Sequence, residues 1–151
     1  GHKIKPISLR TGIIKDWNSR WLPKKADFKN SLEEDVLIRR LIKEKISQAG
    51  IDKVIIERVG DRCRIYIKAA KPGLIIGRGG KGIEELTRLL EKTINGLRAK
   101  QKMKKLSGLS LNIEELKRLE ISATVVAKNI ANDLESRMPF RRVMKKALQN
   151  I

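Results

Sequence analysis

The stretch 74–86, LIIGRGGKGIEEL, contains a Gly-x-x-Gly turn at residues 77–80 between two apolar segments with helical spacing. A turn that begins and ends in glycine lets the backbone approach a phosphate closely. The helix that follows offers free N–H groups and the positive end of its dipole to the same anion. We therefore predict that this turn binds the sugar–phosphate backbone of a nucleic acid. The predicted contact residues are Gly77, Arg78, Gly79, Gly80 and Lys81.

The residues before the turn predict a helix and a β-hairpin. An apolar stripe predicts a helix over 33–49, with Ser31 as its N-cap and Gly50 at its end. Two β-rich segments, 54–59 and 62–69, are separated by a tight-turn signal and predict the hairpin. In the second strand the side chains alternate between an inward set, Cys63, Ile65, Ile67 and Ala69, and an outward set, Arg64, Tyr66 and Lys68.

Residues after the turn predict further helices and one more strand. A helix is predicted over 81–93, a basic loop over 95–108 and a strand over 109–114. A long helix is then predicted over 122–137, and a last helix is predicted to start near Pro139. The buried stripe of the long helix is predicted to consist of Ala123, Val126, Ala127, Ile130 and Leu134. The predicted fold class is therefore α+β.

The charge of the chain favours a polyanionic partner. Formal net charge is +18, from 35 Lys and Arg against 17 Asp and Glu. Segments 96–108 and 137–146 each hold five basic residues and no acidic one, whereas 33–45 is balanced with four of each. Nucleic acid is the leading partner class and an acidic membrane surface is second. In the basic loop, the residues predicted to contact RNA are Lys100, Lys102, Lys104 and Lys105.

The chain lacks the residues that several other classes of protein need. The lone Cys63 forms no disulfide within the chain, and with the lone His2 it leaves no zinc cluster or catalytic triad. There is no apolar run long enough to span a membrane, so we expect a soluble intracellular protein without cofactor or metal. The glycines also match Gly-x-Gly-x-x-Gly, the fingerprint of dinucleotide-binding sites. That fingerprint needs a strand directly before it and an acidic residue about 20 positions later to bind the ribose, and this chain has neither. A plain glycine turn between helices remains the alternative.

Residues 1–30 are predicted to form a basic arm. The segment carries eight basic and two acidic residues, two prolines, and the two tryptophans Trp17 and Trp21. It shows no long periodic pattern, although Ile13-Ile14 could form a short strand or dock on a partner. We expect such an arm to order only on a partner.

The predicted order of elements resembles a type II KH domain, which has a three-stranded mixed sheet with helices on one face. The match extends beyond this order. Three segments, GHKIKPISLRTGIIKDWNSRW, KAAKPGLIIGRGGKGIEEL and ESRMPFRRVMKKALQN, are similar to the family of bacterial small ribosomal subunit protein three. The resemblance implies a type II KH domain at 31–115, with 116–151 as the helical start of a truncated C-terminal domain.

The resemblance also implies a function and partners. It implies a non-enzymatic structural protein of the small-subunit head, in cytoplasmic or organellar ribosomes. The implied partners are small-subunit rRNA, mRNA, and neighbouring head proteins, family members ten and fourteen. Arg141, Arg142 and Lys145 match residues that line the mRNA entrance in the family. Contact with rRNA phosphates is the alternative for these three, because both roles require positive charge.

The chain departs from the family pattern in three places. Its loop at 95–108 is longer and more basic, its turn has Arg78-Gly79 in the middle instead of two long polar residues, and no strand-rich domain follows Ile151. Two alternative functions stay open. One is a stand-alone KH-type regulatory RNA-binding protein. The other is an oligonucleotide-processing enzyme, for which the sequence offers no acid–base or metal cluster.

Overall fold

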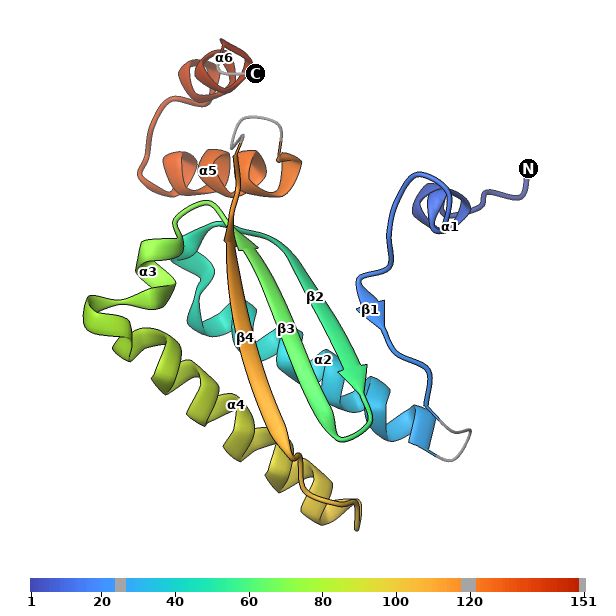
Figure 1. The fold of residues 1–151 in the computed structure, drawn as a ribbon. Coiled ribbons are helices and arrows are strands. Elements are labelled where there is room, and N and C mark those ends of the chain that lie inside the picture. Colours follow the sequence, from blue (N-terminus) through green and yellow to red (C-terminus); the bar gives the residue numbers. More distant parts are fainter. Residues whose placement is uncertain (24–26, 118–121, 150–151) are drawn as a thin grey trace.

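A mixed sheet lies at the centre of the molecule (Figure 1). The computed structural model describes residues 1–23, 27–117 and 122–149. The predicted three strands are β2 (Ile51–Val59), β3 (Arg62–Ala69) and β4 (Gly108–Glu115). β2 pairs antiparallel with β3, and β3 pairs parallel with β4. A two-residue strand, β1 (Ser19–Arg20), adds to β2 in parallel and makes the sheet four-stranded.

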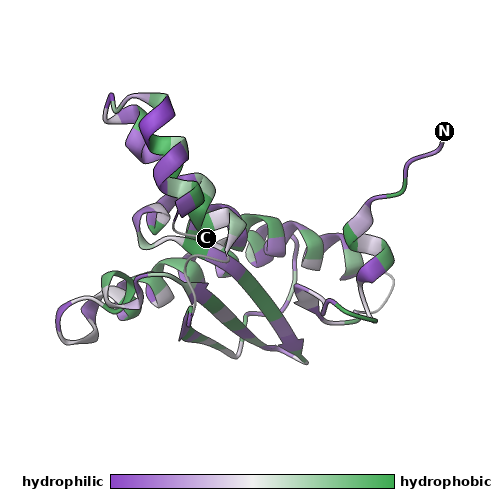
Figure 2. Cartoon of the chain, turned by 90° about the horizontal axis from the view of Figure 1, so that it is seen from above, coloured by the Kyte–Doolittle hydropathy of each residue, from purple (hydrophilic) through white to green (hydrophobic). Residues whose placement is uncertain are grey.

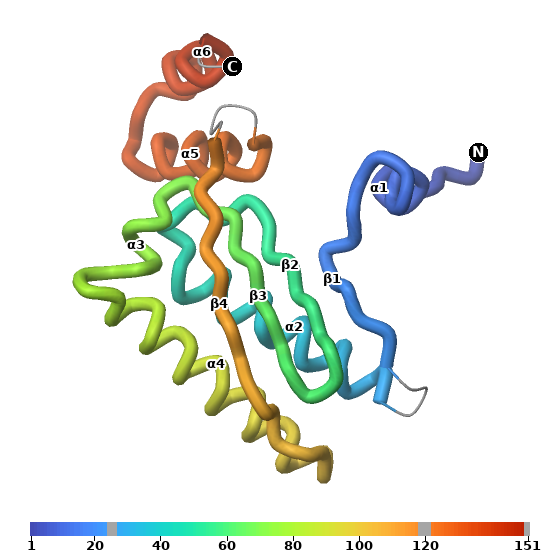
Figure 3. The backbone as a smooth tube through the Cα atoms, viewed as in Figure 1, coloured from blue at the N-terminus to red at the C-terminus, as the bar shows by residue number. Residues whose placement is uncertain are grey.

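Except for a short helix in the arm, which was not predicted, the helices follow the predicted order along the chain (Figure 3). α1 (Pro6–Arg10) lies in the arm, and α2 (Phe28–Lys45) precedes the hairpin. α3 (Pro72–Ile76) and α4 (Lys81–Lys100) flank the glycine turn. α5 (Ala123–Glu135) and α6 (Phe140–Gln149) follow β4. The predicted arm, 1–30, and second domain, 116–151, both include residues outside the described ranges, so these boundaries stay predictions.

The core lies between the sheet and the helices α2 and α4. The inward residues of β3 are all buried, as their alternation predicted. Ile38 and Ile42 from α2 and Leu90 and Ile94 from α4 complete this cluster. Hydrophobic and hydrophilic residues succeed each other along strands and helices (Figure 2). Burial raises the pKa of the Cys63 thiol to about 11, so this cysteine is a core group rather than a nucleophile.

The first long helix begins earlier than predicted. α2 starts at Phe28 and ends at Lys45, and a short 3-10 turn, Ser47–Ala49, follows it. Ser31 is therefore not the N-cap but a buried residue inside the helix, whose carbonyl accepts a 3.4 Å hydrogen bond from Arg58. Gly50 does end the segment, in the left-handed conformation that glycine tolerates.

The helix after the glycine turn is longer than predicted. α4 runs to Lys100, so the first part of the predicted loop 95–108 is helical. This part includes Gly96, and an isolated glycine inside a helix is tolerated when neighbouring residues pack. Here Ile94 and Arg98 are both buried and extend the packed face by another turn.

The stripe predicted for α5 was wrong in its orientation. Of its five residues, Ala123, Ala127 and Leu134 are exposed and Val126 and Ile130 are half-buried. Val125, which was not predicted, is 3% exposed. Ser122 caps the helix by accepting a hydrogen bond from the Val125 backbone N–H, and its hydroxyl donates to Asp52 at 2.5 Å. This link to β2 turns Val125 toward the sheet.

A buried ionic cluster joins helices that are distant in sequence. Glu34 of α2 accepts hydrogen bonds from Arg58 and, at 2.7 and 3.1 Å, from Arg98. Asp35 accepts hydrogen bonds from Arg58 at 2.6 and 3.1 Å. Burial opposes the charge of Arg58, but its bonds to the two carboxylates outweigh burial and raise the pKa of the guanidinium above its usual value.

The same cluster holds part of the arm. Trp21 donates its indole N–H to Asp35 at 2.8 Å, and the Ser19 hydroxyl donates to the same carboxylate at 2.9 Å. The prediction that the arm orders only on a partner was therefore wrong for these residues. The prediction did not take into account that both side chains bind the buried carboxylate of Asp35. Ile13 and Ile14 form no named strand and are 84% and 78% exposed.

Candidate nucleic-acid interface

The glycine turn has a backbone that other residues adopt poorly. Gly77 has φ 69° and ψ −179°, which is a region open essentially to glycine alone. Gly79 and Gly80 also have positive φ values, 61° and 81°. The predicted turn between two helices is thus present, as a single 3-10 turn, Arg78–Gly80, that leads directly into α4.

Gly82 has a role in this turn that the sequence analysis missed. A Cβ at this position would lie 2.6 Å from the Ile75 carbonyl oxygen and 3.1 Å from that of Ile76. A Cβ at Gly77 would lie 3.0 Å from the backbone nitrogen of Gly82. The glycine pair therefore lets α3 approach α4 closely and fixes the path of the turn between them.

Positive charge surrounds the turn. Arg78 and Lys81 are exposed, and among the described residues neither lies within ion-pair distance of a carboxylate. The first N–H groups of a helix have no partner inside it, and the helix dipole favours an anion there. Glu84 in the first turn of α4 reduces this field. The arrangement can bind one phosphate through backbone N–H groups and two mobile cations.

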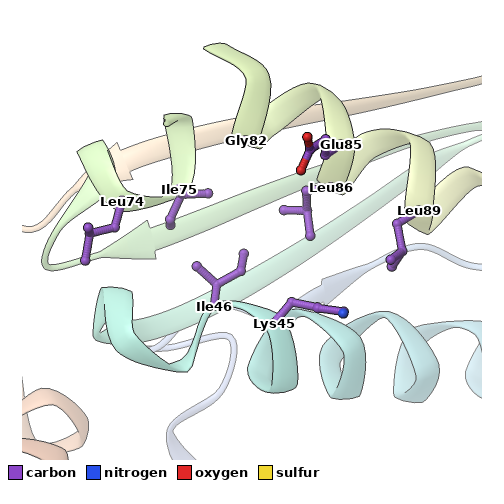
Figure 4. Close-up of a pocket in the computed structure, with 8 residues that line it drawn as sticks. All are labelled: Lys45, Ile46, Leu74, Ile75, Gly82, Glu85, Leu86 and Leu89. Atoms are coloured by element: carbon purple, nitrogen blue, oxygen red, sulfur yellow. The ribbon is translucent and has the colours of Figure 1, made fainter. Parts of the chain in front are cut away.

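A pocket of about 250 Å³ adjoins the turn on the side that faces α2 (Figure 4). Leu74, Ile75 and Leu86 come from the two helices of the turn, and Ile46 faces them from the segment after α2. Lys45 and Glu85 supply one charge of each sign. The pocket is therefore suited to an apolar group rather than to a phosphate.

Gly79 offers a test of the anion site. A Cβ there meets no heavy atom within 4 Å, and its φ of 61° is one that Asp and Asn tolerate better than other residues. We expect Gly79→Asp to weaken binding of a short single-stranded RNA about tenfold or more, because like charges about 4 Å apart repel by about 1–4 kcal/mol. Fluorescence anisotropy measures the affinity. Gly79→Asn is the control, with equal shape and no charge, and equal losses in both variants would contradict an anion site.

The predicted basic loop is shorter than expected and is held in place. Lys100 is the last residue of α4, so only Lys102, Lys104 and Lys105 lie in the loop itself. Lys104 forms an ion pair with Asp61 at 3.2 Å, and its carbonyl accepts a hydrogen bond from Arg98. The loop therefore lies against the turn between β2 and β3.

The third predicted group lies on α6. Arg141, Arg142 and Lys145 are all exposed, and the spacing of 141 and 145 puts them on one face of the helix. The Arg141 guanidinium lies 5.8 Å from the centre of the Phe140 ring. On the opposite side of α6, Val143 is buried. The three cations are thus presented together to solvent.

The structure does not bring the three groups together. The glycine turn and the basic loop lie at opposite ends of α4, which has 20 residues and is therefore about 30 Å long. α6 lies beyond α5, at the end of the molecule opposite the loop (Figure 1). The predicted residues form three separate cationic sites, which a short oligonucleotide cannot span at once.

Neither a membrane-spanning helix nor a grouped set of metal ligands is present in the described ranges. No helix there is both long enough and apolar enough to cross a membrane. Likewise, within residues 1–23, 27–117 and 122–149, no three His, Cys, Asp or Glu side chains are grouped so that they could hold a metal ion.

Comparison with known proteins gives the family. Residues 37–121, more than half of the chain, match the family model of the KH domain. The chain is 45% identical over 148 residues to "Small ribosomal subunit protein uS3" of Caldanaerobacter subterraneus subsp. tengcongensis, covering 98% of this chain and 62% of that protein. It is 46% identical to the protein of the same name from Finegoldia magna, covering 99% of this chain and 57% of that protein. The chain spans about three fifths of the length of these relatives. It belongs to the KH domain family and is a homologue of small ribosomal subunit protein uS3.

Proposed function

We propose that this chain is a structural constituent of the small ribosomal subunit head, where it binds rRNA and contributes to the path by which mRNA enters. The observation that carries the proposal is the glycine turn, flanked by the exposed cations Arg78 and Lys81, in a chain of net charge +18. Nearly the whole of this chain is similar to uS3. Its role is to bind and position RNA, without enzymatic turnover. It acts in a cytoplasmic or an organellar ribosome.

The separation of the cationic sites supports an assembled particle over a free regulatory module. Each site is small, and about 30 Å separates two of them, so a large folded RNA engages more of them than one short message segment does. Counterion release makes such multi-site binding steeply salt-dependent. A structural rRNA contact therefore accounts for the charge better than recognition of a short message element.

The arm supports protein partners in the same particle. Eight large apolar residues within 1–30 are more than half exposed in the described chain: Ile4, Ile7, Leu9, Ile13, Ile14, Trp17, Leu22 and Phe28. Clusters of exposed apolar residues indicate interaction sites. A partner that covers them fits an assembly protein, and we propose the neighbouring head proteins, family members ten and fourteen, for this role.

The mRNA role rests on α6. We expect Arg141→Ala with Lys145→Ala to flatten the slope of log affinity against log salt by about 1.4, because each contact to single-stranded RNA contributes about 0.7. Thermal stability should not change, since both side chains are exposed. Lys29→Ala with Lys43→Ala removes the same charge from the balanced helix α2 and is the control. Equal slopes for the two double variants would remove Arg141 and Lys145 from the RNA contacts.

Cosedimentation tests the proposal as a whole. A tagged copy of the chain, expressed in cells beside the full-length relative, should sediment with small subunits and their precursors at physiological salt. A tagged chain found only in the free fraction, or bound to messages outside ribosomes, would support the regulatory alternative instead.

A further inference from the structure

The face of the sheet opposite α2 is free of helices in the described chain (Figure 1). The strands pass in front of α2 in that view, so the near face is the one that points away from the core. Outward residues of three strands meet on it in register. Tyr66 of β3 lies between Ile55 of β2 and Asn112 of β4. None of the predicted RNA contacts lies on this face.

Charge flanks that central row on both sides. Arg64 lies two residues before Tyr66 on β3, and Lys68 lies two residues after it. Lys53 of β2 lies opposite Lys68. Arg64 and Lys53 are exposed and have no carboxylate within ion-pair distance among the described residues. The acidic residues of this face have their own partners: Glu57, opposite Arg64, pairs with Arg20 at 2.6 Å, and Glu114 pairs with Lys68 at 3.1 Å. The face therefore carries an excess of positive charge on either side of the Tyr66 ring.

We propose that this open sheet face is a second RNA site, which binds a single-stranded segment by stacking one base on Tyr66. Every base has a flat π-face, and a sheet that displays an aromatic ring can stack bases from a single strand. Arg64 on one side and Lys53 on the other meet the phosphates that flank the stacked base. Asn112, beside the ring, offers both a donor and an acceptor to the edge of that base.

The charge pattern favours RNA over a protein on this surface. An apolar protein contact would bury Arg64 and Lys53 without carboxylate partners, which is unfavourable. A polyanion neutralises the same cations and releases counterions. The site is distinct from the glycine turn, because it lies on the sheet face that points away from α2 and the turn lies between two helices. The inference rests on the proposed function only in taking RNA as the ligand.

The test uses the whole chain and a fluorescently labelled single-stranded oligoadenylate. We expect Tyr66→Leu to weaken binding by about five- to a hundredfold, the range that loss of one stacked base produces. Tyr66→Phe keeps the ring and should bind like the unchanged chain. Thermal unfolding of each variant shows whether the sheet remains folded. If the affinity of a folded Tyr66→Leu equals that of Tyr66→Phe, the inference is overturned.

A second measurement needs no substitution. An oligonucleotide that carries 5-iodouridine should, on irradiation, crosslink to the peptide that contains Tyr66, as located by mass spectrometry. Crosslinks confined to peptides of the glycine turn, the basic loop or α6 would overturn the sheet site and leave the proposed function intact. Absence of RNA binding by the unchanged chain would overturn both. Loss of a head protein from the Tyr66→Leu chain, with RNA affinity unchanged, would assign the face to a protein and refute the RNA site.

Discussion

Replacement of Glu34 by alanine is expected to destabilise the fold by about 3–5 kcal/mol, the loss that follows when one partner of a buried ion pair is removed. Glu34 is 1% exposed, and it accepts hydrogen bonds from both Arg58 and Arg98. Without it, the Arg98 guanidinium stays buried and keeps only the Lys104 carbonyl as a partner among the described residues. Urea denaturation followed by circular dichroism measures the change in the free energy of unfolding.

A matched control lies on the same helix. Glu44 forms an ion pair with Arg40 at 2.9 Å, and both side chains are exposed. Removal of such a surface pair changes stability by less than about 1 kcal/mol. Glu44→Ala should therefore unfold close to the unchanged chain. If both alanine variants unfold at the same urea concentration, the buried cluster stabilises the fold no more than a surface pair does.

The buried cluster also shows what sequence reasoning left out. Glu34, Ile38 and Ile42 follow one another at helical spacing, and so do Leu90, Ile94 and Arg98. In both helices a charged residue continues the buried apolar face. Arg58 likewise shares the inward face of β2 with Ile56. A charge on a buried face needs a partner of opposite sign. Glu34, Arg58 and Arg98 together therefore indicate a buried ion-pair cluster, which the sequence analysis did not predict.

Local features of the fold were predictable because their causes are local. Alternation in β3 and the glycine turn each depend on a few consecutive residues, and both were confirmed. The orientation of α5 depended on a hydrogen bond from Ser122 to Asp52, 70 residues away in sequence. The spacing of the cationic sites depended on the length of α4, which was predicted to cover 81–93 but runs to Lys100. Contacts between distant segments therefore account for what the sequence did not reveal.

Gly82→Ala is expected to affect both stability and RNA binding. The added methyl group would lie 2.6 Å from a backbone oxygen of α3, and a backbone atom cannot turn aside as a side chain can. α3 must therefore move away from α4, at a loss of about 1–3 kcal/mol that is typical of overpacking. Because Gly77 packs against Gly82, the same movement distorts the turn. RNA affinity should fall even at temperatures where the variant remains folded.

The same substitution at Gly96, in the same helix, should have the opposite sign. Gly96 is exposed, and a Cβ there meets no heavy atom within 4 Å. Replacement of an exposed helical glycine by alanine stabilises by about 0.5–1 kcal/mol, since the unfolded chain loses freedom. Thermal unfolding and RNA anisotropy on the two variants separate helix propensity from the contact between α3 and α4. Suppose instead that Gly82→Ala is as stable as Gly96→Ala and keeps full RNA affinity. That result would show that α3 and α4 can separate without disturbing the turn. The close approach of the two helices would then have no part in RNA binding.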